Sequence, residues 1–331
     1  MQNPKVALFS AKPYDKEFFT LANKHFQFEI KYFDAHLNLD TCSLAQNYDA
    51  ISIFVNDTLS AEMIDRLHHQ GVKLIALRSA GFNHVDLKAA KGKIHVVRVP
   101  DYSPYAVAEH AIAMMLTLNR KIYRAYWRVR DNNFNIDGLL GFDMHGKTAG
   151  VIGVGRIGQQ VIKILQGFGM KVIAYDIDPK QVEKARCPFA PLDTLYRDSD
   201  IITLHCPLTP DNLHMINRDS LPKMKQGVML INTGRGGLID SRALIDALKT
   251  NKVSAAGLDV YEEESRYFYE DLSQTFISDD VLARLQTFPN VLITSHQGFF
   301  TREALYNIAM TTLENIKVFC EGKPLQNEIS D

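Results

Sequence analysis

The sequence predicts an α/β protein with two doubly wound parallel sheets, and three observations carry this prediction. Apolar, strand-like runs alternate with helical stretches along the chain, a rhythm typical of parallel sheets with helices on both faces. A glycine-rich turn, Gly153-Val154-Gly155-Arg156-Ile157-Gly158, joins one such run to a helical pattern. The length of 331 residues suits two domains of ordinary size, each able to bury a core.

The first hundred residues contain five predicted strands separated by helical stretches. The strands are expected at 6–10, 29–33, 50–55, 74–77 and 96–99. Helical stretches lie at 14–25 and 61–70, and the second has Ser60 as a plausible N-cap and Gly71 as its stop signal. This alternation predicts the first parallel sheet.

The second sheet is expected in the next two hundred residues. Pro100 and Pro104 precede a long helical pattern over 105–130, which marks the passage between domains. Further strands are expected at 148–154, 171–175, 201–205, 228–232, 253–258 and 291–294. A last helical run, 301–320, follows when this sheet is complete, so we expect it to return to the first domain. The predicted domains are therefore 1–100 with 299–331, and 101–298, with a ligand cleft between them.

The glycine turn indicates a dinucleotide site of the Rossmann type in the second domain. Gly153, Gly155 and Gly158 allow a tight turn, close approach of a pyrophosphate and helix–strand packing, and the helix N-terminus then faces the phosphates. Asp176 ends the next strand, where a carboxylate can accept hydrogen bonds from an adenosine ribose. The same carboxylate repels a 2′-phosphate, and Ile177-Asp178-Pro179 contains no arginine to bind one. We therefore expect NAD rather than NADP.

Composition argues against several other classes of protein. There are 37 basic and 38 acidic side chains, so no basic surface suggests nucleic acid as a partner. We expect no signal peptide and no membrane span, because no apolar run is long enough. The four cysteines are scattered, without a C-x-x-C pair or a Cys/His cluster of metal-ligand spacing. These features predict free thiols, a cytoplasmic location and no metal site.

Three later strands of the second domain run directly into polar residues that suit carbonyl reduction. These residues are Arg235, the acidic run Glu262-Glu263-Glu264, and His296. The carboxyl ends of strands in an open α/β sheet border the ligand crevice. Arginine can clamp a carboxylate with its planar fork, and histidine can supply the proton that hydride transfer to a ketone requires. A neighbouring carboxylate would favour the imidazolium, but the residues alone leave open which glutamate supplies it.

Each of these residues also has a non-catalytic interpretation. Arg235 could form a surface ion pair with Asp240, and acidic runs usually lie in solvent. His296 is one of 11 histidines and could be a satisfied core residue. The interpretation as an active site depends on Arg235, the glutamates and His296 being considered together, because all of them follow strands of the domain that carries the glycine turn.

With the glycine turn and the polar residues that follow the later strands, the chain resembles the D-isomer-specific 2-hydroxy acid dehydrogenases, and within them the fermentative D-lactate dehydrogenases of bacteria. The resemblance runs essentially from end to end. The matching segments include Val55-Asn56-Asp57, Leu77-Arg78-Ser79-Ala80-Gly81-Phe82-Asn83, Val107-Ala108-Glu109-His110-Ala111, His205-Cys206-Pro207-Leu208-Thr209-Pro210, Asn232-Thr233-Gly234-Arg235-Gly236, Leu258-Asp259-Val260-Tyr261-Glu262 and His296-Gln297-Gly298-Phe299. The resemblance implies a Rossmann NAD-binding domain and a flavodoxin-like, discontinuous catalytic domain.

The resemblance also implies a role for each matching residue. The implied catalytic residues are Arg235 for the substrate, His296 as acid/base and Glu264 as its carboxylate partner. The implied substrate contacts are the backbone of Ala80 and Gly81 and the side chains of Tyr102 and Phe299. The implied cofactor contacts are Arg156 and Ile157 at the pyrophosphate, Asp176 at the ribose, Asp259 at the nicotinamide carboxamide, and Cys206, Pro207 and Thr233 along the groove.

The activity that the resemblance implies is the reversible, NAD-dependent reduction of pyruvate to D-lactate, as in fermentation. A related reductase of hydroxypyruvate, glyoxylate, phenylpyruvate or a branched 2-keto acid is the nearer alternative, and a non-catalytic NAD(H)-sensing regulator is the more distant one. Tyr102 and Phe299 favour a small pocket and hence lactate. The resemblance further implies a homo-oligomer, a dimer or tetramer, with residues 105–130 and the following loop as the interface.

Overall fold

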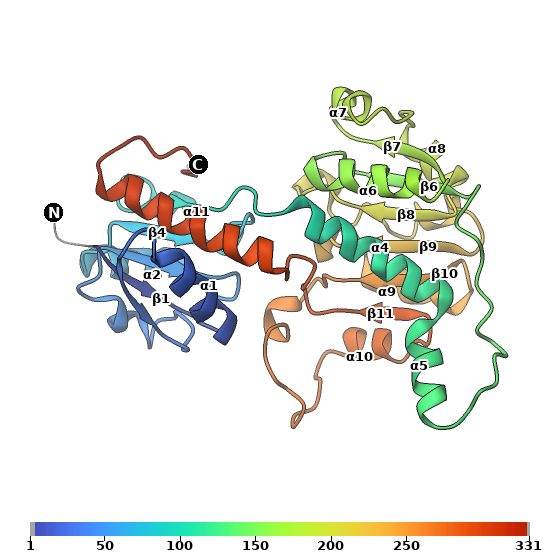
Figure 1. Cartoon of the computed structure of the whole chain (residues 1–331), viewed down its shortest axis with the longest axis horizontal. Coiled ribbons are helices and arrows are strands. Elements are labelled where there is room, and N and C mark those ends of the chain that lie inside the picture. The colour runs from blue at the N-terminus through green and yellow to red at the C-terminus, as the bar shows by residue number, and fades with distance from the viewer. Residues whose placement is uncertain (1–3, 330–331) are drawn as a thin grey trace. The chain divides into compact units, whose positions relative to one another are not determined.

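The computed structural model describes residues 4–329, which divide into two compact units (Figure 1). One unit contains the described residues up to Ser103 together with those from Phe300 onward, and the other runs from Pro104 to Phe299. Each unit contains one parallel sheet with flanking helices. The predicted α/β class with two parallel sheets is therefore confirmed. No helix among the described residues is long and apolar enough to cross a membrane.

The sheet of the first unit has five parallel strands in the order β2-β1-β3-β4-β5. Successive strands are added to one side of β1 first and then to the other, so the switch point lies between β1 and β3. The strands are β1 (Lys5–Leu8), β2 (Glu29–Tyr32), β3 (Ala50–Ile53), β4 (Leu74–Leu77) and β5 (His95–Val97). The helices of this unit are α1 (Pro13–Asn23), η1 (Cys42–Ala45), α2 (Ala61–His69), α3 (Leu87–Ala90) and α11 (Arg302–Cys320). Helices α1 and α11 lie side by side (Figure 1), so the last helix of the chain completes the first unit.

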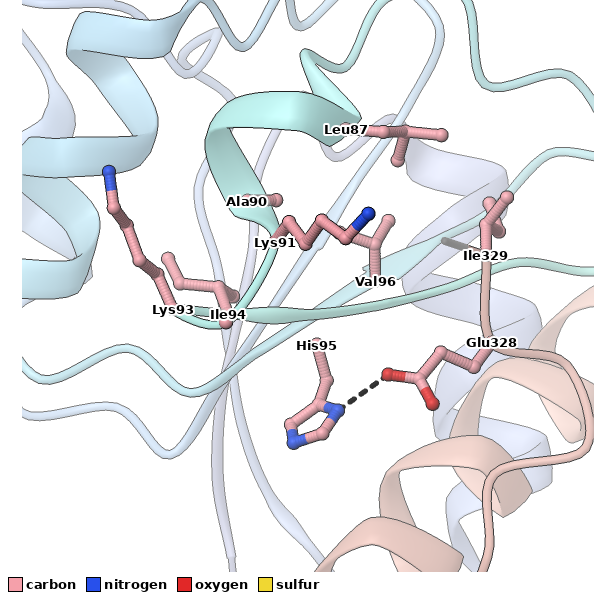
Figure 2. Close-up of a pocket in the computed structure, with 10 residues that line it drawn as sticks. Leu87, Ala90, Lys91, Lys93, Ile94, His95, Val96, Glu328 and Ile329 are labelled. Atoms are coloured by element: carbon pink, nitrogen blue, oxygen red, sulfur yellow. Dashed lines mark hydrogen bonds and ion pairs between the residues drawn. The ribbon is translucent and has the colours of Figure 1, made fainter. Parts of the chain in front are cut away.

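The segment after α11 returns to the edge of β5. Ile329 N donates to the carbonyl oxygen of Val96 at 2.8 Å, and Glu328 forms an antiparallel bridge with Val97. Figure 2 shows the side chains at this edge, where His95 Nδ1 lies 2.6 Å from Glu328 Oε1. The returning segment covers main-chain groups that an edge strand would otherwise expose.

The sheet of the second unit has six parallel strands in the order β11-β10-β9-β8-β6-β7, with its switch point between β6 and β8. The strands are β6 (Thr148–Ile152), β7 (Lys171–Tyr175), β8 (Ile201–Leu204), β9 (Val228–Asn232), β10 (Val253–Leu258) and β11 (Val291–Ile293). Ligands of open α/β sheets bind beyond the carboxyl ends of the strands at such a switch point. The glycine turn follows β6 and therefore lies at that position.

Helices cover both faces of the second sheet (Figure 1), and each face has its own apolar core. One face packs against α4 (Pro104–Arg120) and α6 (Arg156–Gly167). The other face packs against α8 (Leu192–Asp198), α9 (Ser241–Lys249) and α10 (Asp280–Gln286). The remaining helical segments are α5 (Ile122–Arg130), α7 (Pro179–Lys184), η2 (Pro210–Asn212), η3 (Leu221–Lys223), η4 (Gly236–Leu238) and η5 (Glu264–Arg266). Burial on both faces explains why these strands read as continuous apolar runs.

The continuous helix expected over 105–130 is wrong. Lys121 adopts a left-handed conformation (φ +50°) and separates α4 from α5. A loop from later in the chain packs on this end of α4, where the Asn119 side chain exchanges two 2.8 Å hydrogen bonds with the backbone of Phe142. Lys121 Nζ also donates to the carbonyl oxygen of Leu140. Because these partners lie far along the chain, the helical period alone does not reveal the break.

Candidate active site

The predicted chemistry-bearing residues of the second unit lie at one edge of its sheet. Strands β9, β10 and β11 are neighbours, and Asn232, Leu258 and Ile293 are aligned across them. Arg235 follows Asn232 by three residues, and His296 follows Ile293 by three. Parallel pairing therefore brings the three polar turns to the same carboxyl edge as the glycine turn.

The glycine turn has the steric features that a bound pyrophosphate requires. Gly153 has φ +90°, and a Cβ there would lie 2.4 Å from the backbone N of Cys206. A Cβ on Gly158 would lie 2.0 Å from the carbonyl oxygen of Gly153, so strand and helix can pack only through glycine. A Cβ on Gly155 would meet no protein atom within 4 Å. The space beside Gly155, at the N-terminus of α6, fits a phosphate group.

Asp176 follows the end of β7, beside the same turn. Its Oδ2 accepts a hydrogen bond from Val154 N at 2.6 Å, and its Oδ1 accepts one from Asp178 N at 2.9 Å. These contacts hold the carboxylate next to the glycine turn, at the position where an adenosine ribose is expected. Arg156 and Ile157 are the first two residues of α6, so their N–H groups belong to its unsatisfied first turn.

The segment after β8 forms the other side of the switch point. Burial raises the pKa of the Cys206 thiol to about 11, so this thiol is protonated at neutral pH. Burial lowers the pKa of His205 to about 3, so its ring is neutral there. The neutral ring lies between two hydroxyls, 2.8 Å from Thr203 Oγ1 and 3.3 Å from Thr233 Oγ1. Thr233 is thereby linked to β8, and Pro207 continues the turn after Cys206.

Arg235 is held within its own turn after β9. Its Nη1 donates to the carbonyl oxygen of Gly234 at 2.7 Å, and Asn232 Nδ2 donates to the carbonyl oxygen of Arg235 at 2.9 Å. Asp240, which the sequence offers as an ion-pair partner, instead caps α9 by accepting from Arg242 N and Ala243 N. Arg235 is a partly buried residue at the sheet edge.

The three consecutive glutamates have three different environments. Glu264 Oε1 lies 2.8 Å from His296 Nδ1, and Glu264 Oε2 accepts from Tyr261 N at 3.0 Å. Glu262 pairs with His214 across 2.5 Å, and Glu263 is exposed, with its carboxylate 3.8 Å from Arg266. The structure therefore brings Glu264 to His296, as the family resemblance implies and the sequence pattern alone does not decide.

His296 occupies a left-handed backbone conformation (φ +52°) that its surroundings hold in place. Its N–H donates to the carbonyl oxygen of Asp259 at 2.7 Å, and its own carbonyl accepts the hydroxyl of Tyr269 at 3.0 Å. A non-glycine residue in this region is strained and persists only where its neighbours determine it. Asp259 and Tyr269 therefore hold the backbone from which the imidazole extends.

Asp259 is buried, and its carboxylate holds the loop that carries His296. Oδ1 accepts from Thr294 Oγ1 at 2.5 Å and from Gln297 N at 2.9 Å, while Oδ2 accepts from Gly298 N at 2.8 Å. His110 Nε2 also lies 3.2 Å from Oδ1. Hydrogen bonds to the ionised form outweigh burial, so the pKa of Asp259 lies below its usual value. The implied contact of Asp259 with a nicotinamide carboxamide remains a prediction, whereas its contacts within the protein are to this loop.

The implied substrate residues of the first unit follow β4 and β5. Ala80 and Gly81 form a turn that follows Arg78. Arg78 is fully buried, and its guanidinium donates to main-chain carbonyls beside β1 and in β3. Arg98 Nη1 donates to the carbonyl oxygen of Ala80 at 3.0 Å. Tyr102 is partly buried, and Phe299, which lies in the second unit, is buried. The substrate contacts implied for these residues remain predictions.

Tyr269 and His110 are supporting residues that the sequence pattern did not single out for a role. Tyr269 lies in the irregular segment between η5 and α10, and no periodicity connects it with a histidine 27 positions later. His110 stands in the recognised segment Ala108-Glu109-His110, which is the one available signal for it. Tyr269 contacts the backbone of His296, whereas the His110 ring contacts the side chains of Thr294 and Asp259, which belong to or hold the loop of His296.

Comparisons with known proteins agree with this geometry. Residues 112–298 match the family model of the D-isomer specific 2-hydroxyacid dehydrogenase NAD binding domain. The D-lactate dehydrogenase of Escherichia coli strain K12 is 50% identical over 327 residues, covering 98% of this chain and 99% of that protein. A structure of the pyruvate reductase of Chlamydomonas reinhardtii superposes with a TM-score of 0.93 at 46% identity, covering 98% of both chains. A D-lactate dehydrogenase of Aquifex aeolicus, complexed with NAD and lactic acid, gives a TM-score of 0.86 at 34% identity over 98% of this chain and 99% of that one.

Proposed function

The chain belongs to the D-isomer specific 2-hydroxyacid dehydrogenase family, whose cofactor is NAD, and from this premise we propose that it reduces pyruvate to D-lactate. The observation that carries the proposal is the 2.8 Å contact between His296 Nδ1 and Glu264 Oε1, at the sheet edge that also carries Arg235 and the glycine turn. Relatives named for D-lactate or pyruvate support the choice of substrate.

His296 acts as the proton donor in this proposal. Its Nδ1 faces Glu264, so Nδ1 keeps its hydrogen and Nε2 is the atom that holds or releases the exchanged proton. The bound NADH supplies the hydride. In pyruvate reduction the imidazolium protonates the carbonyl oxygen, and in the reverse direction the neutral imidazole accepts the proton of the hydroxyl. Glu264 keeps the ring oriented and stabilises its charged form.

Arg235 binds the substrate carboxylate in this proposal and polarises the neighbouring carbonyl. The hydrogen bond to Gly234 holds its guanidinium near the turn. The side chain therefore loses less conformational entropy when the substrate binds. A planar fork matches a carboxylate with two parallel hydrogen bonds. The family resemblance adds Ala80, Gly81, Tyr102 and Phe299 as further substrate contacts.

The residues at the carboxyl edge fit the cofactor. Gly153, Gly155 and Gly158, with the N–H groups of Arg156 and Ile157, would hold the pyrophosphate, and Asp176 would accept from the ribose hydroxyls. Cys206, Pro207 and Thr233 would line the groove towards Asp259. The protonated thiol of Cys206 adds no charge beside the phosphates.

A substrate panel tests the proposed activity. We expect pyruvate with NADH to give the highest kcat/KM among pyruvate, hydroxypyruvate, glyoxylate, phenylpyruvate and a branched 2-keto acid. A higher kcat/KM for one of the other acids would show that this acid, rather than pyruvate, is the preferred substrate, and the protein would still be a 2-keto acid reductase. Absence of turnover with every acid would reject the proposed chemistry.

We also propose that the chain forms a homo-oligomer through α5 and the loop that follows it. No side chain of α5 is buried, although the helix and the loop carry several large apolar residues. The exposed residues are Ile122, Tyr126, Trp127, Val129, Phe134, Ile136 and Leu140. An apolar surface of this extent is typical of a protein interface, and a second copy of the same chain is the simplest partner. A cytoplasmic location is also proposed, consistent with four free cysteines.

A further inference from the structure

We infer that the His214–Glu262 pair is a positioning device that holds the turns of Arg235 and Glu264 at a fixed distance from each other. The inference rests on the proposed function, because it concerns the same two catalytic residues. His214 Nε2 lies 2.5 Å from Glu262 Oε1, and the two residues are 48 positions apart in the chain. His214 is not among the predicted site residues, and Glu262 is the member of the acidic run that does not contact His296 but pairs with His214 instead.

Glu262 connects the turn after β10 with the helix that follows the Arg235 turn. Its second carboxylate oxygen, Oε2, accepts a hydrogen bond at 3.1 Å from the N–H of Ser241, the first residue of α9. A carboxylate at a helix N-terminus satisfies an otherwise unpaired donor and interacts favourably with the helix dipole. One oxygen of Glu262 thus binds the start of α9, and the other binds His214.

His214 belongs to the segment after β8, which runs beside the Arg235 turn. Its N–H donates to the carbonyl oxygen of Gly237 at 2.7 Å, and Ile216 N donates to the carbonyl oxygen of Leu238 at 3.0 Å. Asp240 N returns a bond to the carbonyl oxygen of Ile216 at 2.9 Å. These bonds attach the segment to residues 237–240 as a short parallel ladder, so His214 moves with the Arg235 turn.

The backbone after Arg235 also touches the backbone before Glu264. A Cβ placed on Gly236 would lie 2.1 Å from the carbonyl carbon of Tyr261 and 2.5 Å from Glu262 N. Glu264 in turn accepts from Tyr261 N, so its carboxylate is anchored on the same residue that Gly236 contacts. A displacement between the two turns would therefore change the distance from the Arg235 guanidinium to the Glu264–His296 pair.

The His214–Glu262 side-chain pair is the polar connection that keeps this backbone contact closed. The His214 side chain is 40% exposed and that of Glu262 is 25% exposed, so water screens the pair and its contribution to overall stability is small. Its effect is instead expected in the relative placement of catalytic groups, where a displacement of about 1 Å can change a rate by about two orders of magnitude.

The test compares pyruvate kinetics of the full-length protein and its variants at the pair. We expect His214→Ala and Glu262→Ala each to lower kcat/KM for pyruvate about tenfold, while KM for NADH stays within about twofold. The double variant should lose no more than the worse single variant, because the two residues act as one unit. Glu262→Gln should recover most of the loss, since its amide oxygen can still accept from Ser241 N.

A second histidine–glutamate pair provides a matched control. His95 and Glu328 lie 2.6 Å apart at the edge of β5 in the first unit (Figure 2), and they are also partly exposed. His95→Ala and Glu328→Ala should leave kcat/KM for pyruvate within about twofold of the unmodified value. A loss at both pairs alike would identify a general effect of removing surface charge.

The inference is overturned if the alanine variants at 214 and 262 keep kcat/KM for pyruvate, or if their losses add in the double variant. It is also overturned if they lower only the melting temperature. Failure of the proposed function is distinguishable, because the unmodified protein would then be inactive with pyruvate. In that case the same variants are assayed with whichever 2-keto acid the substrate panel identifies, and NADH binding is measured separately by its fluorescence.

Discussion

His296 Nδ1 lies 2.8 Å from Glu264 Oε1, and the other oxygen of Glu264 accepts the backbone N–H of Tyr261. The carboxylate therefore connects His296 with the turn after β10. Both side chains are partly exposed, at 21% and 24%. A carboxylate in this position can stabilise the imidazolium and orient the ring, while the ring's Nε2 remains available to substrate.

Replacing Glu264 with glutamine should impair catalysis, whereas the same replacement at Glu263 should not. Glu264→Gln removes the charge beside His296, so we expect kcat/KM for pyruvate to fall about tenfold to a hundredfold. Glu263→Gln serves as the control, because the Glu263 carboxylate is exposed and lies 3.8 Å from Arg266. Steady-state kinetics at constant pH give the comparison. Equal losses at 263 and 264 would mean that contact with His296 is not the cause.

Arg235→Lys should show whether substrate binding depends on the planar, two-pronged geometry of the guanidinium or only on its positive charge. Lysine keeps the positive charge but cannot form two parallel hydrogen bonds, so KM for pyruvate should rise and kcat should fall, together by about two orders of magnitude in kcat/KM. KM for NADH should change little. Arg242→Lys, on the exposed side of α9, is the matched control. An unchanged kcat/KM for Arg235→Lys would assign the substrate carboxylate to another residue.

Asp176 should decide the preference between NADH and NADPH. The unmodified protein should strongly prefer NADH, because the carboxylate accepts from ribose hydroxyls and repels a 2′-phosphate. Asp176→Ser should lower kcat/KM with NADH, raise it with NADPH and so reduce the ratio by about a hundredfold. Asp193→Ser removes a surface carboxylate, paired with Lys223, as the control. Equal use of both cofactors by the unmodified protein would contradict this role.

His205 should make the protein less stable in acid. Burial lowers its pKa to about 3, whereas an unfolded histidine titrates near about 6.5. Between these values the unfolded state binds a proton that the folded state does not, so the free energy of unfolding falls as pH is lowered. The slope for this single group is at most about 1.4 kcal/mol per pH unit.

His205→Gln removes this titration, so its unfolding free energy should fall less steeply than that of the unmodified protein between about pH 7 and about pH 4.5. Urea unfolding at several pH values measures the slope. His68→Gln, on the exposed surface of α2, should leave the slope unchanged. Parallel profiles for His205→Gln and the unmodified protein would show that His205 does not bear the acid sensitivity.

The α5 surface should mediate self-association. Trp127 is the single tryptophan of the chain and is 62% exposed on that surface, so its fluorescence emission should shift to the red when an oligomer is diluted. Leu140→Asp should weaken association by burying an unpaired charge, detectable by sedimentation. Phe276→Asp is the control, because Phe276 is as exposed as Leu140 but lies outside the surface. A monomeric unmodified protein, or equal effects of both variants, would reject this interface.

Several features were predictable because they depend on residues that are close in the chain. The strands β4, β7, β9 and β10 have the bounds that their apolar runs predict, since a strand buried on both faces is continuously apolar. The cap of α2 is likewise local, and Ser60 Oγ accepts from Met63 N as expected. The glycine turn is recognisable for the same reason, because its three glycines lie within six consecutive residues and the conflict between Gly158 and Gly153 is local.

Other features were decided only when distant segments packed together. The break at Lys121 depends on a loop some twenty residues later, and the partner of His296 among three adjacent glutamates depends on a contact across 32 positions. Asp259 holds the loop of His296 through bonds that span 35 to 39 positions. The sequence by itself therefore determined the fold class and the position of the glycine turn, which follow from local sterics and periodic burial. The tertiary structure decided which polar side chains meet, because hydrogen bonds depend on three-dimensional distance and leave no period in the chain.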